Sequence, residues 1–359
     1  MPELSREQVE VAIKEYIDPY LESDLVSAKA VKNIQVEPGS VTVDVALGFP
    51  AKSYVGTLSD ALSERISRLP GNPKVVVNVT TKVASHAVQK GVETLKNIKN
   101  IIAVASGKGG VGKSTVASNL ALALSAEGAN VGILDADMYG PSQPRMLGAS
   151  EKPESSDGRS IDPIVAHGLQ SMSIGYLIDE ETPMIWRGPM VTQALEQLLN
   201  DTNWTDVDYL VIDLPPGTGD TQLTLAQKIP VSGAVIVTTP QDIALLDARK
   251  GLKMFEKVEV PVLGVIENMS VHICTNCGHA EHIFGEGGGP RMAEESDVDF
   301  LGALPLDVAI RRDADGGKPT VIADPDGPIA AQFKDIARRI SGKLSQQAKD
   351  YTQAFPSIV

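Results

Sequence analysis

The sequence predicts an α/β protein in which a mostly parallel sheet is covered by helices on both faces and is preceded by a small α+β domain. From Ile98 onward, helix-forming stretches such as TVASNLALALSAEG separate continuous apolar runs, among them IIAVAS, VGILDAD, YLVIDL, AVIVTT and VLGVIEN. Strands that are apolar along their whole length are typical of a parallel sheet buried on both faces. Before Ile98 the strands instead alternate apolar and polar residues, as expected of a two-layer α+β unit.

The length and composition limit the class of protein. A chain of 359 residues is long for one compact core, so we expect two domains. With 42% hydrophobic and 22% charged residues, it has the composition of a soluble globular protein. No apolar run is long enough to cross a bilayer, and the polar start MPELSREQVEVAIKEY does not resemble a secretory signal.

The net charge limits the binding partners that we expect, and the cysteine content limits the expected cellular compartment. The formal net charge of −14 argues against binding to nucleic acid or to an anionic membrane. The chain has two cysteines, too few for a disulfide framework, so we expect a reducing, cytoplasmic location.

The first domain is expected to span residues 1–85. SREQVEVAIKEYI has helical spacing, with Val9 and Ile13 on one side and Ser5 as the N-cap. NIQVEPGSVTVDVAL alternates on both sides of Pro38-Gly39, which indicates a hairpin. A helix in VGTLSDALSERISRL and a strand in VVVNVT complete an αββαβ order.

Residues 86–97 carry no strong pattern and are expected to form a linker, so that the second domain spans residues 98–359. Within that domain, residues 151–160 (EKPESSDGRS) predict a polar surface loop. GPIAAQFKDIARRISGKLSQQ predicts an amphipathic helix that packs on the sheet.

The strongest functional pattern is ASGKGGVGKST, residues 105–115, which follows a predicted strand and precedes a predicted helix. It fits the P-loop pattern G-x-x-x-x-G-K-[ST]. Glycines let the backbone N–H groups approach phosphates, and the following helix adds the positive end of its dipole. We therefore predict a P-loop NTPase that binds ATP and Mg²⁺. The expected nucleotide-binding residues are Gly107, Lys108, Gly109, Gly110, Val111, Gly112, Lys113, Ser114 and Thr115.

Within this site, Lys113 is expected to reach the β- and γ-phosphates and Ser114 to bind Mg²⁺. Asp213 ends the strand YLVIDL and is suited to hold the Mg²⁺ ion through water. The LPPGTGD segment after it is expected to change shape when the γ-phosphate leaves. Asp135 and Asp137 end another strand, and Asp137 is expected to position the attacking water.

An additional lysine, Lys108, gives the loop the form KGGVGKS. This resembles the deviant Walker A motif of the MinD/ParA class of P-loop ATPases. In that class the corresponding lysine reaches across an ATP-sandwich dimer to the phosphates of the partner. The resemblance therefore implies that Lys108 couples nucleotide binding to dimer formation.

Further segments resemble the Mrp/ApbC branch of this class, the iron–sulfur cluster carrier ATPases. They are DADMYGPSQPRMLG, WRGPM, DLPPGTGD, VIENMS and CTNCGH, and the resemblance covers the chain from Ile98 to the last helix. In related ATPases the asparagine after the VIEN strand contacts adenine, which implies this role for Asn268, with Pro305 and Leu306 flanking the base. WRGPM contains Arg187, for which no mechanism follows.

The N-terminal unit is similar to a small domain that is shared with SufT-like assembly factors and occurs in many bacterial Mrp proteins. This copy contains no cysteine, and its DPYLESDLVSAKAV segment matches the acidic pattern of that domain only loosely. Docking is therefore the expected role of this domain, rather than cluster or thiol chemistry.

Cys274 and Cys277 lie two residues apart in ICTNCGHAEHIFGEGGG, where Gly278 and Gly285–Gly289 are expected to leave the segment flexible. A [4Fe–4S] cluster usually takes four thiolates, so two chains are needed to supply them. Zinc could instead bind, either in the same dimeric arrangement or within one chain through His279 and His282. The pattern also fits a thiol–disulfide pair or a structural cysteine pair. The family resemblance favours a transferable cluster, with the nearby histidines as surface or supporting groups.

Together these features predict a slow, regulatory ATPase that forms a homodimer and holds a labile [4Fe–4S] cluster between its subunits. Its expected partners are apo iron–sulfur clients and a cluster donor or scaffold, without nucleic acid or membrane. Lys108, Lys113 and Asp137 are the candidate catalytic residues. The rival functions are a MinD/ParA-like positioning ATPase and a zinc-stabilised regulatory NTPase.

Overall fold

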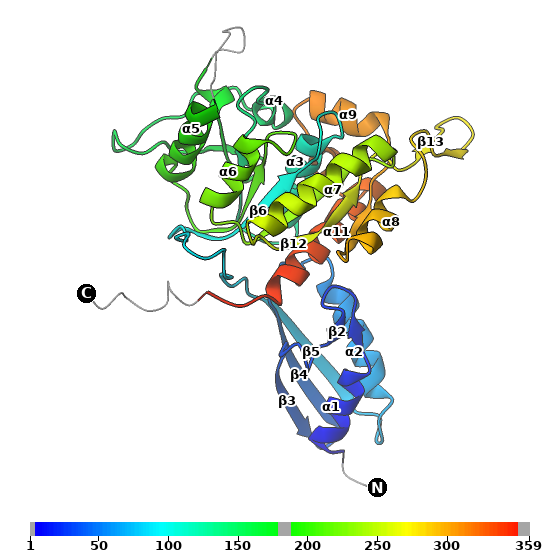
Figure 1. Ribbon diagram of the computed structural model, residues 1–359. Helices are drawn as coiled ribbons and strands as arrows, with labels where there is room; N and C mark the ends of the chain where they lie inside the picture. The colour runs from blue at the N-terminus through cyan, green and yellow to red at the C-terminus, as the bar shows by residue number, and fades with distance from the viewer. Residues whose placement is uncertain (1–3, 179–187, 351–359) are drawn as a thin grey trace. The chain divides into compact units, whose positions relative to one another are not determined.

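The computed structural model describes residues 4–178 and 188–350. The chain divides into two units, of which the first contains residues 1–84 together with 338–349. The second unit contains residues 85–337. The helices and strands of both units are shown in Figure 1.

The first unit is a two-layer α+β domain, as the sequence predicted. Its three-stranded sheet has the order β3-β4-β5, with β3 and β4 antiparallel and β4 and β5 parallel. The turn of the β3–β4 hairpin is the Pro38-Gly39 pair. The elements are α1 (Arg6–Lys14), β1 (Ile17–Asp18), β2 (Ser23–Asp24), β3 (Val31–Glu37), β4 (Ser40–Leu47), α2 (Val55–Ser67) and β5 (Lys74–Thr81).

Local sequence rules account for these elements. Ser5 begins α1 with a capping box, in which its hydroxyl accepts from Gln8 N and the Gln8 side chain accepts from Ser5 N. Strand β4 alternates between buried and half-buried positions, because one face of the sheet covers the core and the other does not. Val9 and Ile13 of α1 are buried in that core.

Residues 86–97, which the sequence predicted to be a linker, pack onto the second unit instead. His86 is buried, and its Nδ1 lies 2.8 Å from Asn100 Oδ1. The Gln89 side chain donates to the backbone oxygens of Ala226 and Ile229, both at 2.8 Å. The sequence gives no sign of these contacts, because isolated polar anchors of this kind leave no periodic pattern.

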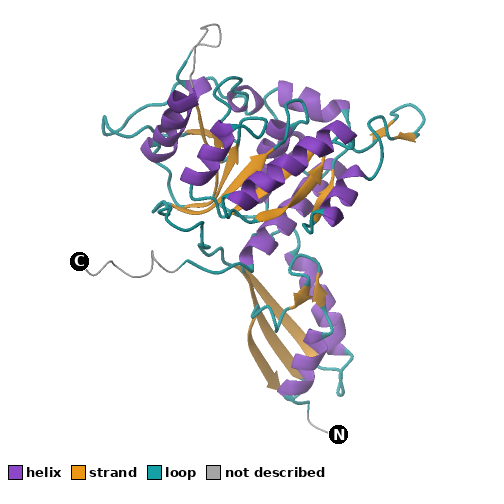
Figure 2. Cartoon of the chain, viewed as in Figure 1, coloured by secondary structure: helices purple, strands orange, loops and turns teal. Residues whose placement is uncertain are grey.

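The second unit is built on an eight-stranded sheet with the order β15-β12-β11-β6-β10-β7-β9-β8. Every neighbouring pair is parallel except β8 and β9. Figure 2 shows helices on both faces of this sheet, in agreement with the predicted fold. Its strands are β6 (Ile98–Ala105), β7 (Val131–Asp135), β8 (Ile164–Ala166), β9 (Leu169–Ser173), β10 (Val207–Asp213), β11 (Gly233–Thr238), β12 (Val262–Glu267) and β15 (Phe300–Ala303).

The helices of the second unit follow the strands along the chain. They are α3 (Lys113–Ala126), α4 (Gln143–Met146), the 3₁₀ helix η1 (Ile174–Tyr176), α5 (Gly188–Asp201), α6 (Asp220–Lys228), α7 (Asp242–Lys257), α8 (Gly288–Glu295), α9 (Val308–Asp315), α10 (Thr320–Ala323) and α11 (Pro328–Ser345). A short hairpin of β13 (His272–Ile273) and β14 (Ala280–Glu281) lies outside the large sheet. Residues 151–160 form no helix and no multi-residue strand, as predicted.

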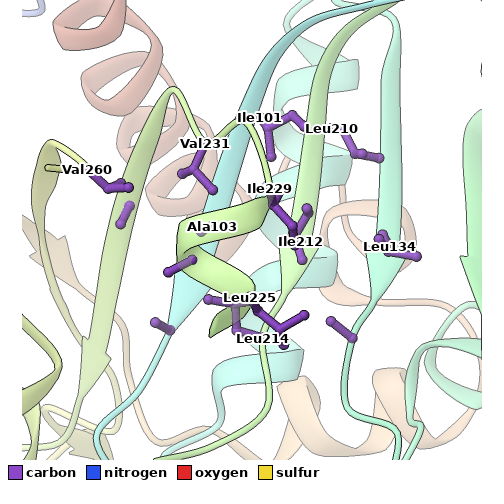
Figure 3. Close-up of a cluster of buried hydrophobic side chains, with 14 of the residues drawn as sticks. Ile101, Ala103, Leu134, Leu210, Ile212, Leu214, Leu225, Ile229, Val231 and Val260 are labelled. Carbon is purple, nitrogen blue, oxygen red and sulfur yellow. The ribbon is translucent and has the colours of Figure 1, made fainter. Parts of the chain in front are cut away.

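The core of the second unit explains the continuous apolar strands. Strands β7, β10 and β11 are buried at every position except Asp208. Ile101, Leu134, Leu210 and Ile212 lie in this core together with Leu225 of α6 (Figure 3). Burying each such side chain contributes about 1.5–3 kcal/mol, so the central strands are held rigidly.

Helix α11 contributes to both units. In the second unit Ile336 lies against β15, where a Cβ added to Gly302 would come within 2.9 Å of Ile336 Cγ1. From Arg338 onward the helix belongs to the first unit, and the Arg338 guanidinium lies 5.0 Å from the centre of the Tyr20 ring. The prediction that this helix packs on the large sheet is therefore correct only for its first part.

In the part of the chain that the structure describes, no helix combines the length and the apolar character needed to span a membrane.

Candidate functional site

The predicted P-loop joins the end of β6 to the start of α3. Gly110 and Gly112 have φ values of 82° and 80°, a region that residues with a Cβ rarely adopt. The loop borders a cavity of about 250 Å³. The cavity is lined by Ser106, Lys108, Gly109, Gly110, Gly112, Lys113, Ser114, Thr115, Asp137, Gly140, Ser142, Met146 and Pro216.

Gly107 is required for close packing rather than for an unusual backbone angle. A Cβ at this position would come within 2.0 Å of the backbone carbon of Asp247 in α7. The beginning of the P-loop therefore rests directly on the backbone of α7.

Lys113 and Asp213 form a buried ion pair across the cavity floor. Lys113 begins α3, and Asp213 is the last residue of β10. Gln143 of α4 joins Asp213 to the start of α3, because its Nε2 donates to Asp213 Oδ2 at 2.9 Å and to Ser114 O at 3.1 Å. In this arrangement the lysine expected to bind phosphate neutralises the aspartate expected to hold Mg²⁺.

Sequence reasoning missed Gln143. It lies in the SQPRM segment eight residues after Asp135, and no motif assigns it a role. Only the fold shows that α4 brings this side chain to the end of β10.

The structure gives different surroundings to Asp135, the last residue of β7, and to Asp137, two residues later. Asp135 is opposite Asp213 in the register of β7 and β10, and it is fully buried. Its carboxylate accepts from Ser142 N at 2.8 Å and from Gln143 N at 3.0 Å, which fixes the start of α4. Burial, followed by the charge of Asp213, raises the pKa of Asp135 to about 7. Asp135 therefore anchors a loop, whereas Asp137 faces the cavity.

Asp137 is half-buried at the cavity wall, and its Oδ1 accepts from Gly140 N at 3.3 Å. Burial raises the pKa of Asp137 above its ordinary value, and the positive charge of Lys113 opposes this shift. Its place in the cavity is compatible with the predicted role of positioning a water molecule.

The LPPGTGD segment is in direct contact with the P-loop. Gly217 N donates to Ser106 O at 3.0 Å, and Pro216 lines the cavity. Gln222 of α6, two residues after the segment, donates through Nε2 to Pro216 O at 2.7 Å. These contacts place the predicted switch segment beside the phosphate loop.

Asn268, Pro305 and Leu306, which were predicted to surround adenine, lie outside the described lining of this cavity. Asn268 is buried, and its Nδ2 donates to Val111 O in the P-loop at 2.9 Å. Leu306 N donates to Val271 O at 2.8 Å, just before the cysteine hairpin. The adenine contacts therefore stay a prediction, while the contact of Asn268 with the P-loop was not foreseen.

Cys274 and Cys277 lie in the turn between β13 and β14, which stands out from the body of the second unit in Figure 1. Cys274 is half-buried and Cys277 is exposed. Gly278 N donates to Cys274 O at 2.8 Å, and Cys274 N donates to His279 O at 2.9 Å. A backbone hydrogen bond from Cys277, followed by one from Asn276, lowers the pKa of the Cys274 thiol below its ordinary value. These contacts favour the thiolate, which is the form that binds metal.

The last two glycines of the run after the hairpin serve close packing, a role that the sequence did not suggest. Gly288 and Gly289 are buried at the start of α8. A Cβ at Gly288 would come within 2.7 Å of Pro240 O, and one at Gly289 within 2.8 Å of Glu267 Cβ. Gly289 N donates to the buried Glu267 carboxylate at 2.5 Å. The absence of side chains at Gly288 and Gly289 therefore allows close packing, and the hydrogen bond from Gly289 N to Glu267 anchors the end of the hairpin segment.

Of two further residues that the sequence analysis named, Lys108 and Arg187, the structure describes only the first. Lys108 is half-buried and borders the cavity. Arg187 lies outside the described residues. Among the described residues, no three His, Cys, Asp or Glu side chains converge on a point that could hold a metal ion.

Comparison with known families agrees with this architecture. The profile of the family described as "NUBPL iron-transfer P-loop NTPase" matches residues 97–341, more than half of the chain. The chain belongs to this family. A second profile, described as "Iron-sulfur cluster assembly protein", matches residues 6–79 of this iron-transfer NTPase.

Several relatives of this iron-transfer NTPase have closely similar sequences. The iron-sulfur cluster carrier protein of Escherichia coli K12 is 49% identical, over 97% of this chain and 95% of its own. The carrier protein of Pseudomonas fragi is 60% identical, over 77% of this chain and 97% of its own. The mouse iron-sulfur cluster transfer protein NUBPL is 48% identical, over 82% of this chain and 88% of its own.

Solved structures support the same fold. A nucleotide-binding protein from Archaeoglobus fulgidus, in complex with ADP, is 37% identical with a TM-score of 0.57 and covers 65% of this chain and 91% of its own. The cell division ATPase MinD of Pyrococcus furiosus has a TM-score of 0.52 at 23% identity and covers 67% of this chain and 98% of its own. The second likeness shows the fold alone.

Proposed function

We propose that this protein is a cytoplasmic iron–sulfur cluster carrier. It binds a labile [4Fe–4S] cluster between two copies of the chain and transfers it to apo-proteins, with slow ATP hydrolysis as the switch. The observation that carries this proposal is the pair of Cys274, half-buried, and Cys277, exposed, in a hairpin that begins shortly after Asn268, which contacts the P-loop. The carrier names of its relatives support the same function.

The proposed shared cluster follows from counting thiolates. A [4Fe–4S] cluster takes four thiolates, and the chain contains two cysteines. A two-fold axis beside the hairpin would bring Cys274 and Cys277 together with the same two residues of a second copy. Because the cysteine turn is exposed, such a cluster would be accessible to an acceptor, as delivery requires.

Exposed apolar side chains support a second copy at this face. Ile243 and Leu246 of α7 are 69% and 55% exposed, and Ile273 and Ile283 beside the cysteine turn are each 52% exposed. Helix α7 adjoins the P-loop through its contact with Gly107. Apolar groups gathered beside functional sites are typical of interaction surfaces. We propose that they form part of the dimer interface, where Lys108 reaches the nucleotide of the partner.

The nucleotide cavity fits Mg²⁺ and phosphate groups. Lys113 would bind the β- and γ-phosphates, and Ser114 and Asp213 would hold Mg²⁺, which supplies charge neutralisation at the phosphates. Asp213 is free to do this only after its ion pair with Lys113 opens, so nucleotide binding rearranges the cavity floor. Asp137 would then orient the attacking water, while Asn268, Pro305 and Leu306 would contact adenine.

Anaerobic reconstitution with iron and sulfide tests this proposal. Cys274→Ala and Cys277→Ala should each abolish the visible charge-transfer band, because two copies of either variant supply only two thiolates. ATP binding should stay within about twofold of the wild type, because neither cysteine lines the P-loop cavity. A variant that keeps the full band would contradict the assignment. Tightly bound zinc without any cluster would favour a zinc-stabilised NTPase instead.

A further inference from the structure

Three histidines surround the cysteine pair, and the structure divides them into two kinds. His272 Nδ1 lies 3.0 Å from Leu306 O, and His282 Nδ1 lies 2.9 Å from Ser270 O. His279 is exposed, and its side chain has no hydrogen bond or ion pair among the described residues.

Both contacts determine which ring nitrogen carries a proton. A backbone carbonyl oxygen can only accept, so His272 and His282 must each donate through Nδ1–H. The orientation of each imidazole ring is therefore fixed by a backbone partner.

The two hydrogen bonds fasten the base of the hairpin. His282 follows β14 and Ser270 precedes β13, so their contact joins the end of the hairpin to its beginning. His272 joins the hairpin to Leu306, which lies beyond β15 in sequence. Between them, β13 and β14 pair over only two residues each, and so short a hairpin has little stability of its own.

We infer that His272 and His282 are positioning residues, which hold the cysteine hairpin in place without binding the cluster. This inference rests on the proposed carrier function. Metal ligands are held most firmly when surrounding hydrogen bonds restrict their motion. The two histidines provide such restriction at the base of a turn whose tip is exposed.

One of these attachment points, Ser270, is itself hydrogen-bonded to the segment after β15. Ser270 donates to Leu304 O through its backbone N at 2.9 Å and through its hydroxyl at 3.0 Å. Two residues earlier, the Asn268 side chain donates to Val111 O in the P-loop. His282 thus fastens the hairpin to Ser270, two residues after the asparagine that contacts the P-loop, and His272 fastens it to Leu306.

The test measures how fast the reconstituted protein loses iron to the chelator ferrozine under anaerobic conditions. His272→Ala and His282→Ala should each lose iron about five to ten times faster than the wild type, the effect of losing one hydrogen bond. His272→Asn and His282→Asn should restore the rate to within about twofold, because an asparagine Nδ2–H can donate from nearly the same place. His279→Ala is the matched control and should behave as the wild type.

The outcomes separate this inference from the proposed function. If the wild type takes up no cluster, the carrier function itself is wrong. If the wild type loads but the alanine variants lose iron at the wild-type rate, the positioning role is wrong. If asparagine does not restore the rate, the hydrogen bond is not what holds the iron and the inference is overturned. If the charge-transfer band shifts in the loaded alanine variants, the histidines are ligands and the inference is likewise overturned. Unchanged ATP binding in each variant shows that the second unit is folded.

Discussion

The nucleotide cavity and the cysteine hairpin are built in opposite ways, although only five residues separate Asn268 from Cys274. The cavity floor is a buried ion pair between Lys113, at the start of α3, and Asp213, at the end of β10, and Gln143 also binds Asp213. The hairpin has two residue pairs and an exposed turn. Under the proposed function this difference corresponds to a division of labour, in which a rigid site would bind the nucleotide and an exposed one would hold a cluster that must leave.

Lys113→Ala should have the largest effect on the rigid site. Removing one partner of a buried ion pair leaves Asp213 uncompensated and should lower the free energy of unfolding of the nucleotide-free protein by about 3–5 kcal/mol. ATP binding should be lost as well. Urea unfolding and titration with a fluorescent ATP analogue measure the two effects.

Lys108→Ala is the matched control, since Lys108 borders the same cavity but forms no ion pair among the described residues. Its free energy of unfolding should stay within about 0.5 kcal/mol of the wild type. Equal destabilisation by the two substitutions would show that the Lys113–Asp213 pair does not stabilise the cavity floor.

Substitution of one glycine in each region tests the same contrast between the P-loop and the cysteine turn, with a smaller expected effect. Gly107→Ala should lower the free energy of unfolding by about 3 kcal/mol, because its Cβ would meet the backbone of α7 at 2.0 Å. Gly278→Ala in the cysteine turn has open space around it and a φ of 73°. The Gly278→Ala substitution should lower the free energy of unfolding by at most about 1 kcal/mol, because the hairpin can open locally without unfolding the sheet. Urea unfolding of both variants provides the measurement, and a larger loss for Gly278→Ala would contradict the contrast.

The sequence predicted most of the fold because its signals are local. Apolar strands, the Pro38-Gly39 turn and the Ser5 cap each act within a few residues. The same holds for the P-loop, whose glycines and lysine are contiguous, and for the position of Asp213 at a strand end.

What the sequence did not predict depends on contacts between distant segments. Gln143 reaches Asp213 only because α4 folds over the end of β10. Asp135 and Asp137 differ in burial and in hydrogen-bond partners, which the sequence does not show. In the sequence, Gly288 and Gly289 suggest a flexible run. In the fold they are buried at the start of α8, and Gly289 packs against Glu267. Residues 86–97 lack periodicity, yet Gln89 anchors them to α6 and the segment after it.

The most direct test of the shared site is the mass of the species that carries the cluster. Native mass spectrometry of the anaerobically reconstituted protein should find the cluster only on a pair of 38.0 kDa chains, with four irons per pair. Chains without cluster should account for all of the monomer. A monomer that carries a complete four-iron cluster would contradict the central claim, because a single chain cannot supply four thiolates.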